Sequence, residues 1–380
     1  MGPLAGIKII ELAGIGPGPF AAMLLADMGA TVIRVDRTAK VDIGIAIPPR
    51  LNVMNRGRRS IAVDLKSKEG NEVVLRLVSQ ADALLEGFRP GVTERLGLGP
   101  EVCLARNPKL VYGRMTGYGQ DGPMSAVAGH DINYIALAGV LSMIGEKGRK
   151  PVAPLNLVGD FGGGGMFLAF GVLCGILEAK NSGKGQVVDA AMTEGAALLA
   201  NIFFSFRPTK QWTDQRGENV LDGGAHFYDT YETKDGGYIA VGAIEKVFYV
   251  KLLQLMGLNP PEFEPQDDKS RWPGWKARFT EVFKSKTRAE WTAILAHEDA
   301  CAMPVLTTNE AIAHPHNVAR QAFVQHEGVE QVAPTPRFSR TQPELKLPPP
   351  IPGEHTAKVL ADFGFTEAEI ATLKARGSVA

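Results

Sequence analysis

The chain has 380 residues, 45% of them hydrophobic, and its 41 basic residues balance 41 acidic ones. A chain of this length can bury a large core and is expected to form two domains rather than one. Because the net charge is zero, no overall field attracts the protein to nucleic acid or to an anionic membrane, so any anion-binding site must be local.

Targeting and redox signals predict a cytoplasmic protein. The first ten residues lack a secretory signal, and the final Ser378-Val379-Ala380 is not a peroxisomal address. The apolar stretch over 166–177 contains two glycines and is shorter than the ~20 residues that cross a bilayer, so we expect a buried helix. Cys103, Cys174 and Cys301 lie far apart in apolar surroundings, which predicts buried free thiols.

The first 200 residues alternate apolar strands with helical patterns. We expect strands over 7–12, 31–35, 60–64, 83–86, 110–115 and 187–190, and helices over 20–28, 68–80 and 166–180. This alternation predicts an α/β fold, a Rossmann-like large domain with an open parallel sheet covered by helices.

A different pattern begins after Asn201. Residues 230–233 and 238–241 flank Asp235-Gly236-Gly237 and predict an antiparallel hairpin. We therefore expect a large domain over 1–200, a smaller α+β domain over 201–330, and a final part over 331–380. In that final part, seven prolines over 334–352 predict an extended connector, followed by helices over 356–363 and 366–376 that return to the large domain.

The turn over 14–19, with Asp36 at the end of the next strand, superficially matches a dinucleotide-binding fingerprint. Pro17 and Pro19 remove two backbone donors from this turn, and Arg37 favours a phosphate over a ribose hydroxyl. A group of basic residues near predicted strand ends could grip phosphates or form an ordinary solvated surface: Arg34, Arg37, Arg56, Arg58, Arg59, Lys66, Arg89 and Arg95.

Three further residues are candidates for proton transfer. His130 lies between Gly129 and Asp131 at an apparent helix start, and imidazole titrates near neutral pH, although a lone histidine is often structural. Asp160 precedes the glycine run 162–165; it could cap a helix, or the glycines could admit a substrate while helix-end N–H groups stabilise an oxyanion. Glu245 follows an apolar strand and, taken alone, is an ordinary exposed acid.

Several motifs together resemble the superfamily of family III CoA-transferases and racemases over nearly the whole chain. They are Glu11-Leu12-Ala13-Gly14 with Pro17-Gly18-Pro19, Ala62 to Lys66, Arg89 to Val92, Gly129 to Tyr134, Pro154 to Leu157, Gly183 to Val187, Leu221 to Ala225, and Val241 to Glu245. Within the superfamily the chain is most similar to the racemases of 2-methylacyl-CoA thioesters. Residues 39–50 form a longer segment than is usual in the family.

The resemblance implies a catalytic set and a coenzyme A site. His130, assisted by Glu245, is implied as one base and Asp160 as the other, in an interlocked homodimer that needs no metal and no cofactor beyond the CoA of its substrate. The implied CoA-binding residues are Arg37, Val63, Asp64, Leu65, Lys66, Gly87, Phe88, Arg89, Arg95, Gly129, Asp131, Ile132, Asn133 and Tyr134.

Two other functions stay open. A CoA-transferase would use Asp160 as a nucleophile that forms an acyl anhydride, and the motif around His130 favours the racemase over it. A non-catalytic acyl-CoA sensor would share the fold but has no need of His130, Asp160 and Glu245 together.

Overall fold

The computed structural model describes residues 1–39 and 44–380, and residues 40–43, part of the long 39–50 segment, lie outside this description. The chain forms two compact units. The first contains Met1–Ala138, Leu155–Leu199 and Arg320–Ala380, and the second contains Gly139–Pro154 and Ala200–Ala319.

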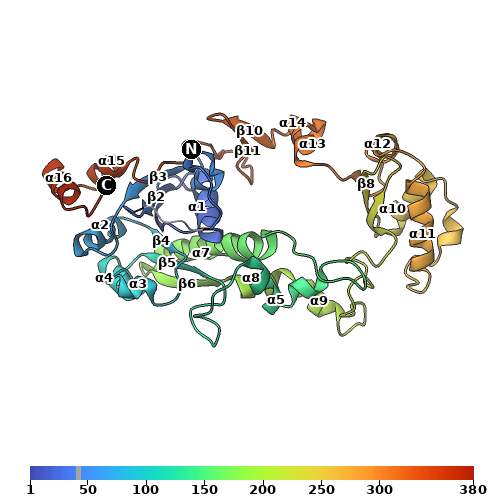
Figure 1. Cartoon of the computed structure of the whole chain (residues 1–380), viewed down its shortest axis with the longest axis horizontal. Coiled ribbons are helices and arrows are strands. Elements are labelled where there is room, and N and C mark those ends of the chain that lie inside the picture. The colour runs from blue at the N-terminus through green and yellow to red at the C-terminus, as the bar shows by residue number, and fades with distance from the viewer. Residues whose placement is uncertain (40–43) are drawn as a thin grey trace. The chain divides into compact units, whose positions relative to one another are not determined.

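The first unit is built on a six-stranded sheet with the order β3-β2-β1-β4-β5-β6 (Figure 1). All neighbouring strands pair in parallel. The strands are β1 (Lys8–Leu12), β2 (Thr31–Asp36), β3 (Arg58–Ala62), β4 (Ala83–Glu86), β5 (Val111–Thr116) and β6 (Gln186–Ala191). The predicted α/β fold with an open parallel sheet is therefore confirmed.

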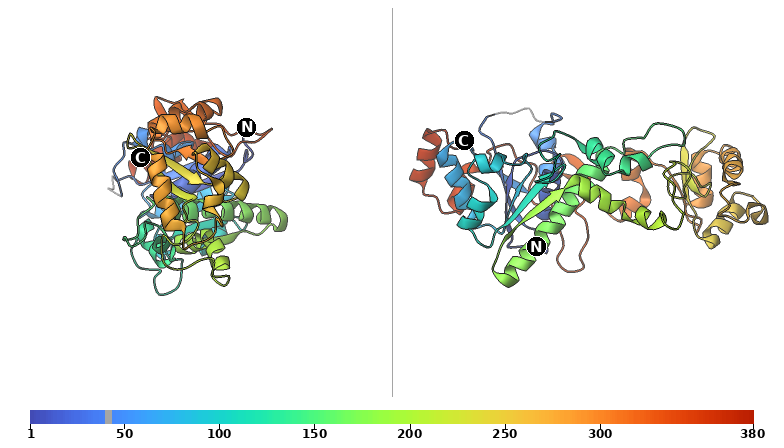
Figure 2. Two further views of the ribbon diagram at one scale, coloured as in Figure 1. Left: turned by 90° about the vertical axis from the view of Figure 1, so that its right-hand side faces the viewer. Right: turned by 90° about the horizontal axis from the view of Figure 1, so that it is seen from below.

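Helices cover both faces of this sheet because alternate strand residues point to opposite sides. Ile9 joins a core formed with α1 (Pro17–Asp27) and α7 (Met166–Ser182). Ile10 joins a second core on the other face. Figure 2 shows helices on both sides of the sheet. That second core is formed with α2 (Lys68–Val78), α4 (Pro100–Arg106), α15 (Thr356–Asp362) and α16 (Glu367–Ala375).

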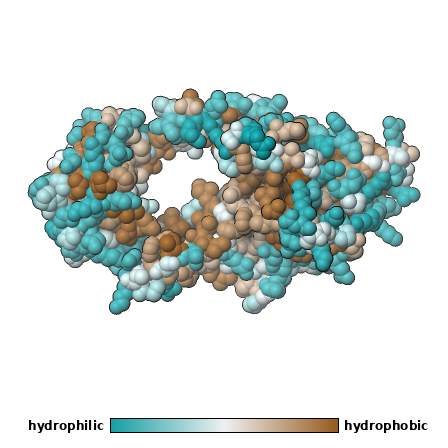
Figure 3. Space-filling view, turned by 180° about the vertical axis from the view of Figure 1, so that it is seen from behind, coloured by the Kyte–Doolittle hydropathy of each residue, from teal (hydrophilic) through white to brown (hydrophobic). Residues whose placement is uncertain are grey.

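Helix α7 corrects the expectation of a fully buried helix. The π-helical segment η3 (Leu157–Gly165) runs directly into it, so the continuous helix spans Leu157–Ser182. Its length and composition alone would suffice to cross a membrane, a test that core helices of soluble proteins also pass. One face packs on the sheet, while Met166, Phe170 and Leu177 are exposed, and Figure 3 shows apolar surface where this helix lies.

The C-terminal segment pairs with the end of β3. Val379 bridges Val63, the Asp64 N–H donates to the Ser378 carbonyl, and the Ala380 N–H donates to the Ala62 carbonyl. Other short elements of the first unit are η1 (Pro49–Leu51), η2 (Val53–Asn55), α3 (Val92–Arg95), α5 (Asp131–Leu137), α8 (Met192–Leu199), β10 (Phe323–His326) and β11 (Val329–Val332).

The second unit contains an antiparallel sheet with the order β7-β8-β9. Its strands are β7 (Tyr228–Glu232), β8 (Tyr238–Gly242) and β9 (Ala302–Pro304), so the predicted hairpin forms as expected. Aromatic side chains dominate its core. Its helices are α6 (Val140–Met143), α9 (Asn201–Phe206), α10 (Lys246–Leu255), η4 (Pro260–Phe263), α11 (Trp272–Phe283), α12 (Arg288–Leu295), α13 (Thr308–Ala313) and α14 (Pro315–Ala319).

The cysteine prediction is half correct. All three cysteines carry free thiols, but only Cys103 is buried, whereas Cys174 and Cys301 are exposed. Cys174 lies on the outer face of α7, because only one side of that helix packs on the sheet. An apolar sequence context therefore did not reveal which face of the helix would be covered.

Candidate active site

A pocket lies over the carboxyl ends of β1 and β4, between the turn after β1 and the loop after β4. Gly14, Ile15 and Gly18 line it from one side and Gly87 from the other. The helices that follow these two neighbouring strands cover opposite faces of the sheet. Such a switch point is where open α/β sheets bind ligands.

The buried Glu11, which lines this pocket, belongs to a group of buried ion pairs. The Glu11 carboxylate accepts a hydrogen bond from Arg34 Nη1 at 2.7 Å and another from Arg58 Nε at 3.1 Å. Asp36 is also occupied, since its carboxylate accepts from Arg34 Nε at 3.1 Å and from the Ser60 hydroxyl at 2.6 Å. These residues hold the strand ends together.

Three members of the basic group are therefore not available to phosphates. Arg34 and Arg58 are buried against Glu11, and Arg56 is buried with its guanidinium Nη2 2.6 Å from Asp27 Oδ2. The idea that the whole basic group grips phosphates is wrong for these residues, because each is neutralised by a carboxylate inside the unit. Asp36 is likewise unavailable to a ribose.

The remaining basic residues of the implied coenzyme A site are exposed: Arg37, Lys66, Arg89 and Arg95. The guanidinium carbon of Arg37 lies 5.9 Å from the centre of the Phe88 ring, so the side chains that follow β2 and β4 come together across the end of β1. Val63 and Leu65 are buried in the core, which leaves only their backbone available to a ligand. Asp64 accepts a hydrogen bond from the Lys66 N–H at 3.0 Å and so shapes this turn.

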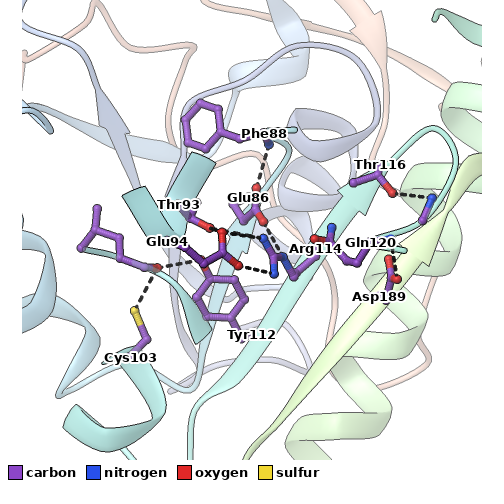
Figure 4. Close-up of polar contacts among 12 residues, drawn as sticks. Glu86, Phe88, Thr93, Glu94, Cys103, Tyr112, Arg114, Thr116, Gln120 and Asp189 are labelled. Carbon is purple, nitrogen blue, oxygen red and sulfur yellow. Dashed lines mark hydrogen bonds and ion pairs between the residues drawn. The ribbon is translucent and has the colours of Figure 1, made fainter. Parts of the chain in front are cut away.

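A buried arginine supports the loop over 87–89, as Figure 4 shows. Arg114 on β5 donates from Nε to Glu86 at 2.8 Å, and Glu86 in turn accepts the Phe88 N–H at 2.7 Å. The same guanidinium donates from Nη1 to Glu94 on α3 at 2.8 Å. Arg114 thus ties the loop after β4 to the short helix that carries Arg95.

Asp160 lies inside η3 and faces the turn after β1. Its carboxylate accepts a hydrogen bond from Asn156 Nδ2 at 3.1 Å, and a Cβ at Gly16 would approach its Oδ2 to 3.2 Å. Burial raises the pKa of the Asp160 carboxyl above its ordinary value, and the charge of Asp131 adds to that rise. The hydrogen bond from Asn156 and the charge of His130 oppose it. A carboxyl with a raised pKa can both take and return a proton.

The glycine run after Asp160 serves helix packing rather than substrate entry. A Cβ at Gly163 would come 2.5 Å from the Ala196 backbone nitrogen, and one at Gly195 would come 1.8 Å from the Gly163 carbonyl oxygen. The run lies within a continuous helix, so Asp160 does not cap a helix start. Both earlier interpretations of this run are therefore wrong, and the glycines instead let α8 approach the backbone of η3.

His130 is exposed and immediately precedes α5. Its backbone N–H donates to the Asn133 side chain at 3.0 Å, and Ile132 is exposed beside it. Tyr134 is buried, and its hydroxyl donates to the Gly129 carbonyl, which fixes the backbone before His130. The imidazole thus lies at the exposed surface of the first unit.

Asp131 connects the segment that carries His130 to the segment that carries Asp160. Its Oδ2 accepts a hydrogen bond from the Asp160 N–H at 2.7 Å. The family resemblance implied Asp131 as a CoA-binding residue, but its side chain is buried and turned toward η3. The two candidate bases of the first unit are therefore linked through one buried carboxylate.

Glu245 belongs to the second unit and is exposed at the start of α10. Its carbonyl accepts the Tyr249 N–H at 3.0 Å, which begins the helix. Sequence reasoning included Gly16 and Asn156 in its motifs but gave neither an individual role, and it did not name Arg114. Asn156 lies four residues before Asp160, a helical spacing that could have indicated the contact.

The profile of CoA-transferase family III matches residues 4–356, and the chain belongs to this family. Over 373 residues it is 48% identical to the alpha-methylacyl-CoA racemase of Mus musculus, covering 97% of this chain and 96% of the relative. The human alpha-methylacyl-CoA racemase is 46% identical over 97% of this chain and 95% of its own length. A CAIB/BAIF family protein from Brucella suis shares the structure with a TM-score of 0.81 and 28% identity, covering 95% and 99% of the two chains.

Proposed function

We propose that the protein is an isomerase that interconverts (R)- and (S)-2-methylacyl-CoA thioesters. The observation that carries this proposal is the linked pair of different proton carriers, His130 at the start of α5 and Asp160 in η3, joined through Asp131. Similarity to two racemases over nearly the whole chain supports the same function.

The chemistry requires two bases. An α-proton of a thioester is weakly acidic, and its loss gives an enolate whose negative charge rests on the thioester oxygen. One base must remove the proton from one face of the α-carbon while an acid on the other face returns a proton. In this proposal neutral His130 takes the proton of the (S) form and protonated Asp160 supplies one, and the roles reverse for the (R) form.

Coenzyme A binds as part of the substrate, and we propose no further cofactor. Its phosphates are assigned to the exposed cations Arg37, Lys66, Arg89 and Arg95 around the carboxyl edge of the sheet. Arginine suits this task because its planar guanidinium can hold phosphate oxygens in pairs. The loop over 87–89, supported by Arg114, is assigned to the same coenzyme.

Heavy water separates this function from the alternatives. Incubation of pure (R)-2-methylacyl-CoA should give a mixture of both enantiomers, each carrying one deuterium at the α-carbon. A CoA-transferase would instead move CoA to a free carboxylic acid without inversion, and a binding protein would leave the thioester unchanged. Inversion without deuterium uptake would contradict the proposed proton transfer.

We also propose an interlocked homodimer in which Glu245 of one chain assists His130 of the other. Exposed apolar side chains on α7 and α9, including Phe170, Ile202 and Phe204, favour coverage by a second copy, since soluble monomers rarely expose large apolar patches. Light scattering should then give twice the mass of one chain.

Complementation tests the shared site. His130→Ala chains, which alone do not invert the substrate, and Glu245→Gln chains, which alone are weakly active, should regain racemase activity when refolded together, because half of the mixed dimers' sites receive both native residues. Random pairing would restore about a quarter of all sites. A mixture no more active than its parts would show that Glu245 does not act across the dimer. The cytoplasmic location stays a prediction.

A further inference from the structure

Asp131 is a buried carboxylate whose acceptor capacity is only half used. Its side chain is 5% exposed, and its Oδ2 accepts the Asp160 N–H at 2.7 Å. Its Oδ1 has no hydrogen-bond partner, and among the described residues no basic group lies within 4.0 Å of the carboxylate. Burial without full pairing destabilises the fold, so a functional reason is required.

The direction of this side chain separates it from an ordinary helix cap. Asp131 is the first residue of α5, yet its carboxylate bonds to the backbone of η3, 29 residues later in the chain. A Cβ at Gly159 would lie 2.6 Å from the same Oδ2, so a glycine in η3 leaves the space that this contact needs. Both segments are therefore built to bring Asp131 against Asp160.

We propose that Asp131 is a positioning residue that fixes Asp160 relative to His130 and places a negative charge beside it. The inference rests on the proposed two-base function and deepens it. Asp131 follows His130 directly in the sequence, so a shift of α5 carries His130 and the anchor of Asp160 together. The distance between the two bases is thereby kept constant while one base removes a proton from the substrate and the other returns one.

The charge of Asp131 has a second consequence. An ordinary aspartate has a pKa of about 3.9 and an imidazole about 6.5, so a proton shared between them would rest almost always on the imidazole. Burial raises the pKa of Asp160, and the charge of Asp131 raises it further. Two groups beside Asp160 oppose this rise in its pKa: Asn156, which donates a hydrogen bond to the carboxylate, and His130. The buried charge therefore raises the proton affinity of Asp160.

Polar neighbours on α5 fit the same picture. Burial raises the pKa of the Tyr134 hydroxyl to about 12, the charges of Tyr118, Asp160 and Asp131 add to that rise, and Arg89 opposes it. Arg89 is exposed and assigned to coenzyme A, so we expect substrate phosphate to engage it. The negative charge of Asp131 then continues to raise the pKa of Asp160 in the complex.

The experiment compares Asp131→Asn, Asp131→Ala and the control Asp121→Asn, which removes a charge from an exposed position of the same unit. Deuterium uptake from each enantiomer is measured against pH. In Asp131→Asn the limb governed by Asp160 should move to lower pH for the (R) substrate, while the limb governed by His130 stays in place. In Asp131→Ala, turnover should fall about 100-fold because the anchor is lost, with KM within about twofold.

A titration without turnover separates this inference from the proposed function. Carbon-13 NMR of labelled aspartate carboxyls, with Asp160 assigned by its loss in Asp160→Asn, gives its midpoint in wild type and in Asp131→Asn. A fall of that midpoint in Asp131→Asn supports the inference even if the wild type does not racemise its substrate. An unchanged midpoint, or an unchanged pH profile in an active enzyme, overturns it. Asp131→Asn keeps the side-chain shape, so it decides the matter if Asp131→Ala fails to fold.

Discussion

Replacing Gly195 by alanine should disturb the helix that carries Asp160. An added Cβ would lie 1.8 Å from the Gly163 carbonyl oxygen, whereas ordinary contact begins at about 3.4 Å, so α8 and η3 must separate by about 1.6 Å. Overpacking against backbone that cannot rotate away costs about 3 kcal/mol. In a unit of this size that loss lowers the unfolding midpoint by at least about 5 °C.

The same displacement should reach the chemistry. Misplacing a catalytic group by ~1 Å can cost ~100-fold in rate, so turnover of Gly195→Ala should fall by at least tenfold at a temperature where the chain is folded. Gly274→Ala is the matched control, because Gly274 also lies in a helix but a Cβ there meets nothing within 4 Å. Calorimetry and racemase turnover measure the two effects. A Gly195→Ala protein with native midpoint and native turnover would refute the close-packing account of the glycine run.

Two further predictions concern the coenzyme and pH. Arg37→Ala and Arg95→Ala should raise KM for the acyl-CoA about tenfold or more and change turnover little, since phosphate contacts far from the reacting carbon bind ground and transition states alike; a turnover collapse with unchanged KM would contradict the assignment. Burial lowers the pKa of His226 to about 3, and its Nε2 lies 2.5 Å from the Tyr249 hydroxyl. Between pH 6.5 and 3 the unfolded chain therefore binds a proton that the folded chain does not, so stability present above pH 6.5 is lost as pH falls, by about 1.4 kcal/mol per pH unit. In urea titrations, the difference in unfolding free energy between wild type and His226→Gln should shrink by roughly 2 kcal/mol from pH 7 to pH 5. An equal difference at both pH values would contradict the lowered pKa of His226.

The sheet could be predicted from the sequence because its strands are continuous apolar runs separated by turns. β4 begins and ends where the pattern predicts, and the other strands differ by one or two residues. The runs of β1 to β5 are largely buried between helices, so local composition identifies them, whereas the edge strand β6 is partly exposed. The hairpin of β7 and β8 is equally local, because a glycine turn sets its register.

Contacts between distant segments could not be predicted in this way. Whether Arg34, Arg56 and Arg58 face solvent or a buried carboxylate depends on which strand lies beside which. The bond from Asp160 to Asp131 joins two segments whose pattern gave each a separate role. The glycine run was misinterpreted for the same reason, since its packing partner, α8, lies 30 residues further along the chain.

The exposed face of α7 shows a further limit. Its apolar residues run around the whole helix, a pattern typical of a fully buried segment. In one chain only the face toward the sheet is covered, and Met166 and Phe170 remain exposed. Sequence hydropathy thus did not indicate that one face of this helix is exposed.

The two-base account is tested most directly by measuring deuterium uptake from each enantiomer separately in His130→Ala and Asp160→Asn. His130→Ala should exchange only the (R) substrate, which faces Asp160, and Asp160→Asn only the (S) substrate, while neither variant inverts its substrate. Glu245→Gln should behave as a weaker form of His130→Ala, because Glu245 orients the imidazole and carries no proton to carbon. Equal exchange of both enantiomers in His130→Ala would contradict the assignment of the two bases.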